Sequence, residues 1–243
     1  MGGLATLPGV PIDARTRLLL VLTATFVVCL VVGDLIGGKL VSVGPVTSPV
    51  TVSVGMIPFP VTFLLTDLLN EFYGRRVARF VTLLGLGMAV LTYAVIYAAG
   101  ALPIAALTRA PGFPGVTEDA FERVFLASQR IILGSLTAYV IAQLLDIAVF
   151  QALKRRTGQR WLWLRATGST AISQLVDTVV ISVIAWWGIL PAAGVLGVAL
   201  SSYAIKLVVA IALTPVVYAG HAALERWAGM EPAPVEPAAD STS

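Results

Sequence analysis

The stretch FPVTFLLTDLLNEFYGRR, residues 59–76, places two carboxylates and a carboxamide inside an apolar helical pattern. Asp67 and Glu71 are four positions apart and Asn70 precedes Glu71, so all three side chains would share one face of a helix. Such a face combines hydrogen-bond acceptors with donors. Charged groups persist inside a membrane mainly where they face a bundle interior or a polar cavity. The stretch therefore predicts a helix that borders a polar path.

An amide followed three positions later by a carboxylate occurs twice further along the chain. Gln143 and Asp146 form the first pair, and Gln174 and Asp177 form the second. Residues three apart lie on the same side of a helix. A face that alternates donors and acceptors suits the edge of a flat, amide-rich heterocycle, so these pairs are candidate ligand-binding residues.

The last two apolar segments contain further candidates. Tyr203 and Lys206 are again three positions apart. Trp186 and Trp187 could supply a stacking surface for a planar ring, although tryptophans near the end of a helix more commonly act as interfacial anchors.

Purely structural roles are the alternative for several of these charges. Glu71 could pair with Arg75 across one helical turn, and Asp146 could pair with Lys206 to hold two helices together. Asp177 has the strongest functional case because no basic residue lies within a turn of it in the sequence. A carboxylate in that setting needs a ligand, a proton or Lys206.

The composition is that of an integral membrane protein. Hydrophobic residues make up 58% of the chain and charged residues 12%, about half the ~25% of soluble domains, and the mean hydropathy is +0.91. So few charges cannot cover a surface that faces water. The formal charge of +3 comes from basic residues between apolar segments rather than from a patch with interleaved aromatics, so we expect lipid and no nucleic acid as partner.

Several kinds of chemistry are excluded by the residues that the chain lacks. Cys29 and His221 are single, which leaves no disulfide framework, no zinc cluster and no Ser-His pair, and we expect His221 at a helix end. There is no GxxxxGK[ST] loop for ATP hydrolysis and no GxSxG motif. We therefore expect no cofactor and no enzymatic activity, with an intramembrane enzyme as a remote alternative.

The hydropathy pattern predicts an all-α fold with six transmembrane helices. Each apolar segment approaches the roughly 20 residues needed to cross a bilayer. The valine-rich segment 39–55 contains Gly-Pro and Ser-Pro breaks and predicts a short hairpin or re-entrant connection between the first two helices. The predicted spans are residues 18–36, 51–72, 80–101, 131–153, 171–190 and 195–219.

Basic residues predict the orientation of this bundle. With six spans, eleven of them fall on the side of the two termini, including those of 154–165, against Lys39, Arg109, Arg123 and Arg130 on the other. The positive-inside rule makes the first side cytoplasmic. We predict a cytoplasmic segment at 1–17, a transporter domain at 18–220 and a mostly disordered cytoplasmic tail at 221–243. Residues 102–129 would form an outward loop with one short amphipathic helix.

Four motifs resemble one known family. They are FPVTFLLTDLLNEFYG, AQLLDIAVF, the serine-rich approach to Asp177 and Thr178, and the YAIK segment of the last span. They are similar to those of the bacterial queuosine precursor transporter family, also described as vitamin uptake transporters, over residues 18–219. The segment DLIGGK departs from the Asn-rich version of the family, with Asp34 and Gly38 in place of asparagines and Lys39 retained.

The resemblance implies an inner-membrane importer of queuosine precursors, 7-cyano-7-deazaguanine and 7-aminomethyl-7-deazaguanine, salvaged for tRNA modification. It also implies a helical arrangement like that of the substrate-binding membrane subunits of energy-coupling-factor transporters. Our hypothesis is that Asp177 with Gln174 recognises the guanine-like edge, since charge-assisted hydrogen bonds are roughly twice as strong as neutral ones. Asp67, Asn70 and Glu71 would form the opposing wall or gate. The remaining polar lining would be Gln143, Asp146, Tyr203 and Lys206.

Other arrangements stay open from the sequence. The chain could be the membrane subunit for another vitamin or base and work with an external ATPase. Transport could be facilitated, proton-coupled or ATPase-assisted. Small residues that would let helices or protomers pack closely allow a homodimer as well: Gly85, Gly87, Gly194 and Gly197.

Overall fold

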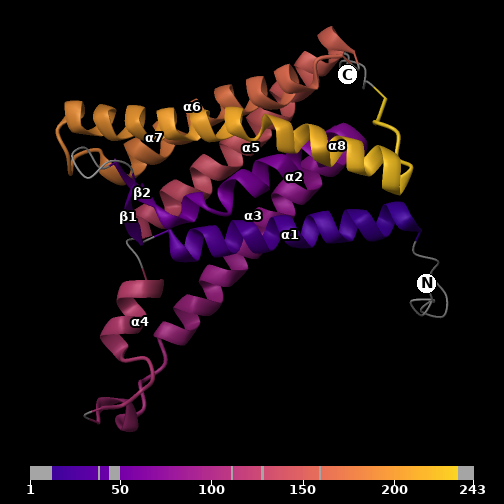
Figure 1. The fold of residues 1–243 in the computed structure, drawn as a ribbon. Helices are drawn as coiled ribbons and strands as arrows, with labels where there is room; N and C mark the ends of the chain where they lie inside the picture. Colours follow the sequence, from indigo (N-terminus) through magenta and orange to yellow (C-terminus); the bar gives the residue numbers. More distant parts are fainter. Residues whose placement is uncertain are drawn as a thin grey trace, which may run out of the picture.

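The computed structural model describes residues 13–37, 39–43, 50–110, 112–126, 129–158 and 160–234, which form a helical bundle with one small hairpin (Figure 1). The elements follow in chain order. They are α1 (Ala14–Ile36), β1 (Leu40–Val43), β2 (Val50–Ser53), the 3-10 turn η1 (Val54–Met56), α2 (Phe59–Phe72), α3 (Gly74–Gly100), the 3-10 turn η2 (Ala106–Arg109), α4 (Glu118–Phe125), α5 (Gln129–Thr157), α6 (Leu162–Trp186), α7 (Ala192–Ala212) and α8 (Thr214–Ala228).

Within the described residues, five helices are long and apolar enough to cross a membrane: α1, α3, α5, α6 and α7. Their outer faces expose large apolar side chains, such as Val28, Leu83 and Val208. A water-soluble protein rarely exposes so many, and lipid is the solvent that suits them. The chain is a multi-pass helical membrane protein.

The second predicted span, residues 51–72, differs from the structure. Its first part pairs as the antiparallel hairpin β1–β2, in register Leu40↔Ser53, which confirms the predicted hairpin. The helix α2 begins only at Phe59, with Pro60 in its first turn, where the missing N–H of proline does no harm. Fourteen residues span only about 21 Å, less than the ~30 Å of a hydrocarbon core.

The last predicted span, residues 195–219, is divided into α7 and α8. The division falls at Leu213, and Pro215 then lies in the first turn of α8, because proline cannot continue the hydrogen bonding of α7. The helix α8 runs on to Ala228, so His221 lies in the middle of this helix. The expectation that His221 lies at a helix end is therefore wrong.

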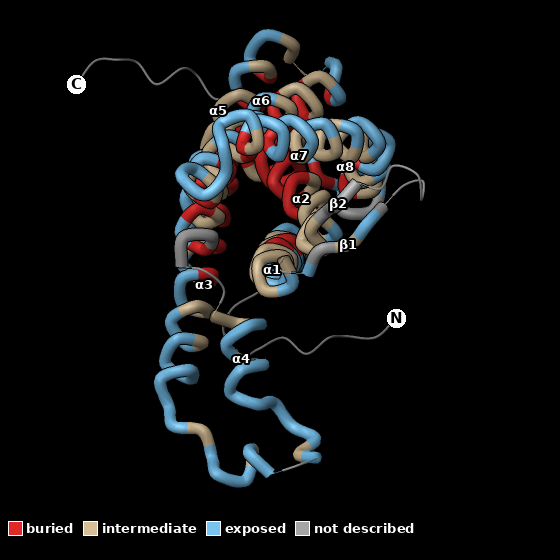
Figure 2. Tube along the Cα trace, turned by 90° about the vertical axis from the view of Figure 1, so that its left-hand side faces the viewer, coloured by how far each residue is buried: buried red, intermediate tan, exposed pale blue. Residues whose placement is uncertain are grey.

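The short helix α2 lies inside the bundle. It packs against α1, α3, α5, α6 and α8, and nearly all of its residues from Thr62 to Phe72 are buried (Figure 2). Phe26, Leu69 and Ile147 belong to the apolar core around it. A Cβ at Gly85 would lie 2.9 Å from both Phe26 and Tyr139, so this glycine serves close helix packing within one chain.

One end of the bundle gathers the start of α1, the end of α2 and the end of α8 (Figure 1). The carbonyls that close α2 are bonded there. Arg15 Nη2 donates to Phe72 O at 2.8 Å, and Ala233 N donates to Glu71 O at 2.7 Å. Tyr73 Oη donates to Arg15 O at 2.8 Å. The segment after α8 therefore completes the C-terminal end of α2.

At the opposite end, the hairpin is held against α1. Ser53 Oγ donates to Gly37 O at 2.6 Å, and the backbones of Gly33 and Gly55 approach so closely that a Cβ at Gly55 would lie 2.6 Å from Gly33 O. The second half of α3 and the short helix α4 extend away from the rest and are largely exposed (Figure 2). The helix α4 confirms the short helix predicted within residues 102–129.

Candidate functional site

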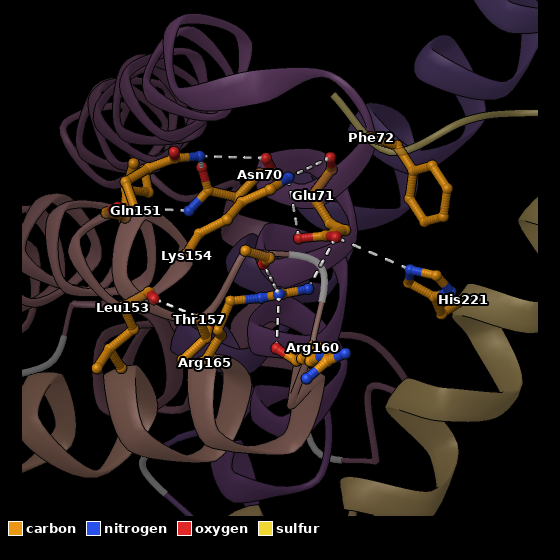
Figure 3. A network of polar contacts seen from close by, with 12 residues as sticks. Asn70, Glu71, Phe72, Gln151, Leu153, Lys154, Thr157, Arg160, Arg165 and His221 are labelled. Atoms are coloured by element: carbon orange, nitrogen blue, oxygen red, sulfur yellow. Dashed lines mark hydrogen bonds and ion pairs between the residues drawn. The ribbon is translucent and has the colours of Figure 1, made fainter. Parts of the chain in front are cut away.

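The predicted site residues of α2 divide between a structural cluster and a pocket. The cluster, here called the Glu71 cluster, consists of Glu71, Lys154, Arg165 and His221 (Figure 3). Lys154 Nζ lies 3.1 Å from Glu71 Oε2, and Arg165 Nη2 lies 2.8 Å from Glu71 Oε1. All three side chains are about 1% exposed. His221 Nε2 approaches Oε1 more loosely, at 3.9 Å.

The cluster ties α2 to α5, α6 and α8. Lys154 Nζ also donates to Glu71 O at 3.1 Å, and Arg165 Nη1 donates to Gly158 O at 2.5 Å and Arg160 O at 3.1 Å, which fixes the turn between α5 and α6. The predicted spans put Lys154 and Arg165 in a cytoplasmic loop. They lie instead inside helices, buried as counter-ions.

Asn70 has a similar packing role. Its Oδ1 accepts from Gln151 Nε2 at 2.7 Å (Figure 3), and its Nδ2 donates to Ile147 O at 3.4 Å. These bonds join α2 to α5, and they occupy the amide that was expected to face a ligand.

A pocket lies on another side of α2, between α2, α6 and α7. Two adjoining hollows share five lining residues, so we treat them as one and call it the α2–α7 pocket. Asp67 and Val217 line one part, and Phe59, Met56 and Lys206 line the other. The shared residues are Pro60, Phe63, Thr170, Ala210 and Leu213.

Aromatic rings form one wall of this pocket. The ring centroids of Phe59 and Phe63 are 4.7 Å apart at 49°, and Lys206 Nζ lies 4.8 Å from the centroid of Phe59. Neither phenylalanine was predicted as a site residue from the sequence, which offered Trp186 and Trp187 as the stacking surface instead. Trp187 is 59% exposed at the end of α6, the position of an interfacial anchor.

Lys206 connects the pocket to Asp177. Its Nζ lies 2.5 Å from Asp177 Oδ2, and each side chain is 13% exposed. The alternative pairing of Lys206 with Asp146 is therefore wrong, and Asp177 has the partner that the sequence left open. Tyr203 Oη donates to Ala171 O at 3.2 Å, a second link between α7 and α6.

Several buried polar atoms have no hydrogen-bond partner in the described part of the chain. Asp146 Oδ1 accepts from Ser173 Oγ at 3.0 Å, whereas its Oδ2 has none, and both amide atoms of Gln174 lack partners. Buried polar groups are nearly always bonded in folded proteins, so a concentration of unbonded ones marks a place for a ligand, a proton or water. Asp67 Oδ1, which lines the pocket, is a further unbonded atom, and so are Gln143 Oε1 on α5 and Thr178 Oγ1 on α6.

The sequence indicates only in part which polar residues belong to the Glu71 cluster and which belong to the pocket. Asp67, Gln143, Asp146 and Gln174 are recognisable because they are polar within apolar segments. The counter-ions of Glu71 come from positions 83 and 94 residues away. The sole hint was that Arg165 lies inside an apolar run, WLWLRATGST.

A multi-pass helical bundle with a pocket between its helices and buried polar groups in its spans suits a membrane transporter. Residues 53–220 match the family model described as "Putative vitamin uptake transporter", and the chain belongs to this family, as its motifs predicted.

Two curated relatives agree. The chain is 36% identical over 171 residues to the "Probable queuosine precursor transporter" of Bacillus subtilis strain 168, covering 70% of this chain and 71% of that protein. It is 33% identical over 133 residues to the "Queuosine precursor transporter" of Escherichia coli strain K12, covering 55% and 54%. No solved structure matches, so the likeness to energy-coupling-factor subunits stays a prediction.

Proposed function

We propose that this protein imports queuosine precursors, 7-deazaguanine bases such as 7-cyano-7-deazaguanine and 7-aminomethyl-7-deazaguanine, across the bacterial inner membrane. The observation that supports it best is the α2–α7 pocket, where the Phe59–Phe63 pair lies beside Lys206, the ion-pair partner of Asp177. The printed names of the relatives point to the same class of substrate.

The chemistry of a 7-deazaguanine fits these groups. Its flat bicyclic ring would stack on Phe63 and Phe59. Aromatic side chains can stack on any nucleobase, because every base has a π-face. Its ring N–H and exocyclic amine would donate to a carboxylate, and Asp177 with Gln174 is our candidate pair. Asp177 must then exchange Lys206 for the ligand, so ligand entry and opening of the α6–α7 ion pair are one event.

The remaining predicted residues keep secondary roles in this proposal. Asp67 forms the wall opposite α6, and Gln143 and Asp146 lie deeper in the polar lining. Asn70 and Glu71 would act as a closed floor through their bonds to α5 and α6. Tyr203 holds α7 against α6. The hollows are small in this structure, so the base enters only when α7 moves away from α2.

Basic residues support a cytoplasmic location for both termini. The end of the bundle that gathers the start of α1, the end of α2 and the end of α8 also carries Arg76, Arg79 and Arg156. Positive charges near membrane-spanning segments favour the cytoplasmic side. We place six crossings in the membrane, with η1 and α2 together forming the second and α7 with α8 forming the sixth.

Ligand binding to purified protein in detergent tests the proposal. A ligand that binds only the folded state raises its stability by ~2.7 kcal/mol at a hundredfold excess over Kd, which a thermal shift detects. We expect a shift with 7-cyano-7-deazaguanine and none with riboflavin, a smaller one with guanine, and loss of the shift in Asp177→Asn. Asp119→Asn, an exposed carboxylate of α4, is the matched control. Equal responses to all three compounds would refute the assignment.

A further inference from the structure

Asp67 on α2 and Asp146 on α5 flank the same turn of α6, because Asp67 lines the pocket beside Thr170 and Asp146 accepts from Ser173. Asn70, one turn after Asp67, donates to the carbonyl of Ile147, the residue after Asp146, which brings these two turns together. Asp67 and Asp146 are both buried, with exposed fractions of 4% and 0%.

Neither carboxylate has a cation of its own in the described structure. The nearest buried cations are already paired, since Arg165 contacts Glu71 at 2.8 Å together with Lys154 at 3.1 Å.

The other charged groups nearby are engaged elsewhere. Lys206 on α7 pairs with Asp177, and Asp34 on α1 accepts from Ser135. On α8, His221 lies between Glu71 and Glu225. The Asp67–Asp146 pair therefore has an excess of negative charge in a low-dielectric interior, where an uncompensated charge costs several kcal/mol.

The unbonded atoms point to the same place independently. Asp67 Oδ1, Asp146 Oδ2 and Gln143 Oε1 are all acceptors, all buried and all without a donor in the described residues. Gln143 is three positions before Asp146, so it shares that face of α5. One added O–H group would supply a donor to this set and remove one negative charge.

A proton suits the site better than a metal cation. Hard cations need six or more oxygen ligands at short range, and the described residues hold no group of three or more acidic, histidine or cysteine side chains able to bind one. The hydroxyls around Asp146 belong to Ser169, Thr170 and Ser173, and Ser173 donates to its Oδ1 at 3.0 Å.

We propose that the Asp67–Asp146 pair carries one proton, on either carboxyl, and that this proton is the coupling ion for uptake of the base. It is taken from water on the outer side, forms an O–H bond on one carboxyl, and returns to water when that bond breaks on the cytoplasmic side. Nothing is oxidised or reduced. This inference rests on the proposed function for the identity of the co-transported base.

The fold supplies a link between the two sites. Ser173 donates to Asp146, and the next residue, Gln174, belongs to the proposed base site. Thr170, one turn earlier, lines the pocket together with Asp67. Protonation and base binding therefore act on the same turn of α6, so each changes the affinity for the other by the same factor.

Infrared spectroscopy without any substrate tests the proton site directly. The carbonyl stretch of a protonated carboxylic acid is separate from that of a carboxylate and shifts in D2O. We expect the difference spectrum between the wild-type protein and Asp67→Asn or Asp146→Asn at neutral pH to contain one such band, and none with Asp119→Asn. Two independent variants guard against one that does not fold. Spectra in which neither variant removes a band would overturn the proposal.

Proteoliposomes test the coupling, with radiolabelled 7-cyano-7-deazaguanine as the probe. For one proton per base, a gradient of one pH unit, acid outside, supports about tenfold accumulation, since one unit is worth 1.36 kcal/mol. We expect Asp146→Asn to lower the accumulation ratio to one, a quantity that does not depend on the rate of exchange. Accumulation driven by sodium, or retained in the variant, would contradict the inference. A wild-type protein that neither exchanges nor accumulates the base defeats the proposed function, while the infrared result decides the proton site alone.

Discussion

Lys206 on α7 and Asp177 on α6 form an ion pair with 2.5 Å between Nζ and Oδ2, and 13% of each side chain is exposed. Lys206 also lines the α2–α7 pocket and lies over Phe59. The pair thus neutralises a carboxylate beside the pocket and closes α7 against α6 in the same contact. A ligand that competes for Asp177 loosens both.

We predict that Lys206→Met destabilises the protein by about 1–3 kcal/mol, because it leaves Asp177 partly buried without a counter-ion. The double variant Asp177→Asn with Lys206→Met should recover most of this loss. A double-mutant cycle on thermal unfolding in detergent measures the coupling. Simple additivity of the two single effects would show that the pair contributes nothing.

The Glu71 cluster should be essential for stability. Glu71→Gln leaves Lys154 and Arg165 buried without a compensating charge, and breaking a buried pair in this way costs about 3–5 kcal/mol. Glu225→Gln is the matched control, because Glu225 is half exposed and contacts only His221 among the ion pairs described; there we expect less than about 1 kcal/mol. Similar melting temperatures for the two variants would contradict a structural role of the cluster.

The aromatic wall predicts a loss of affinity without a loss of fold. Phe63→Leu keeps an apolar side chain, so the stability cost stays below about 1.5 kcal/mol. Stacking of a base on an aromatic ring is worth about 1–3 kcal/mol, so the Kd for 7-cyano-7-deazaguanine should rise roughly five- to 150-fold. Phe121→Leu removes a ring of similar packing in α4, outside the pocket, and should leave the Kd unchanged. If both variants bind alike, Phe63 is not part of the base site.

Two glycines give a matched test of the hairpin. A Cβ at Gly55 would lie 2.6 Å from Gly33 O and 3.1 Å from Gly37 Cα, so Gly55→Ala has to push η1 away from α1, at a cost of about 1–3 kcal/mol. Gly87→Ala meets nothing within 4 Å and should leave stability equal or slightly higher, since alanine is the better helix former. Melting curves of the two proteins compare them directly, and equal effects would argue against a tight α1–η1 contact.

Hydropathy predicts the long lipid-facing helices well, because α1, α3, α5 and α6 repeat the apolar composition that lipid demands. It overestimates the second span, since apolarity alone does not separate a valine-rich strand from a helix of the same composition. The prolines at the start of α2, Pro58 and Pro60, were the sequence signal that the helix begins only there. Pro215 was a similar signal for the division of the last span, but a proline in an apolar run also fits a kinked single helix.

The candidate site is predictable only where polarity is anomalous. Asp67, Gln174 and Asp177 stand out within apolar segments. In the structure Asp67 lines the α2–α7 pocket, and Asp177 pairs with Lys206, which also lines it. Phe59 and Phe63 do not stand out, because phenylalanine in a membrane helix is ordinary. The partners of Glu71 depend on contacts between distant segments, which no local spacing encodes.

The burial of α2 has a consequence for biogenesis. The helix is short and bears Asp67, Asn70 and Glu71, so it cannot partition into lipid by itself at roughly 2.5–3.5 kcal/mol for each charged residue. Its counter-ions, Lys154 and Arg165, are synthesised 83 and 94 positions after Glu71. Only Tyr73 separates α2 from α3, so α3 can insert first and hold α2 at the membrane until α5 and α6 arrive. Ribosome-bound chains that end before α5 should leave α2 accessible to aqueous reagents.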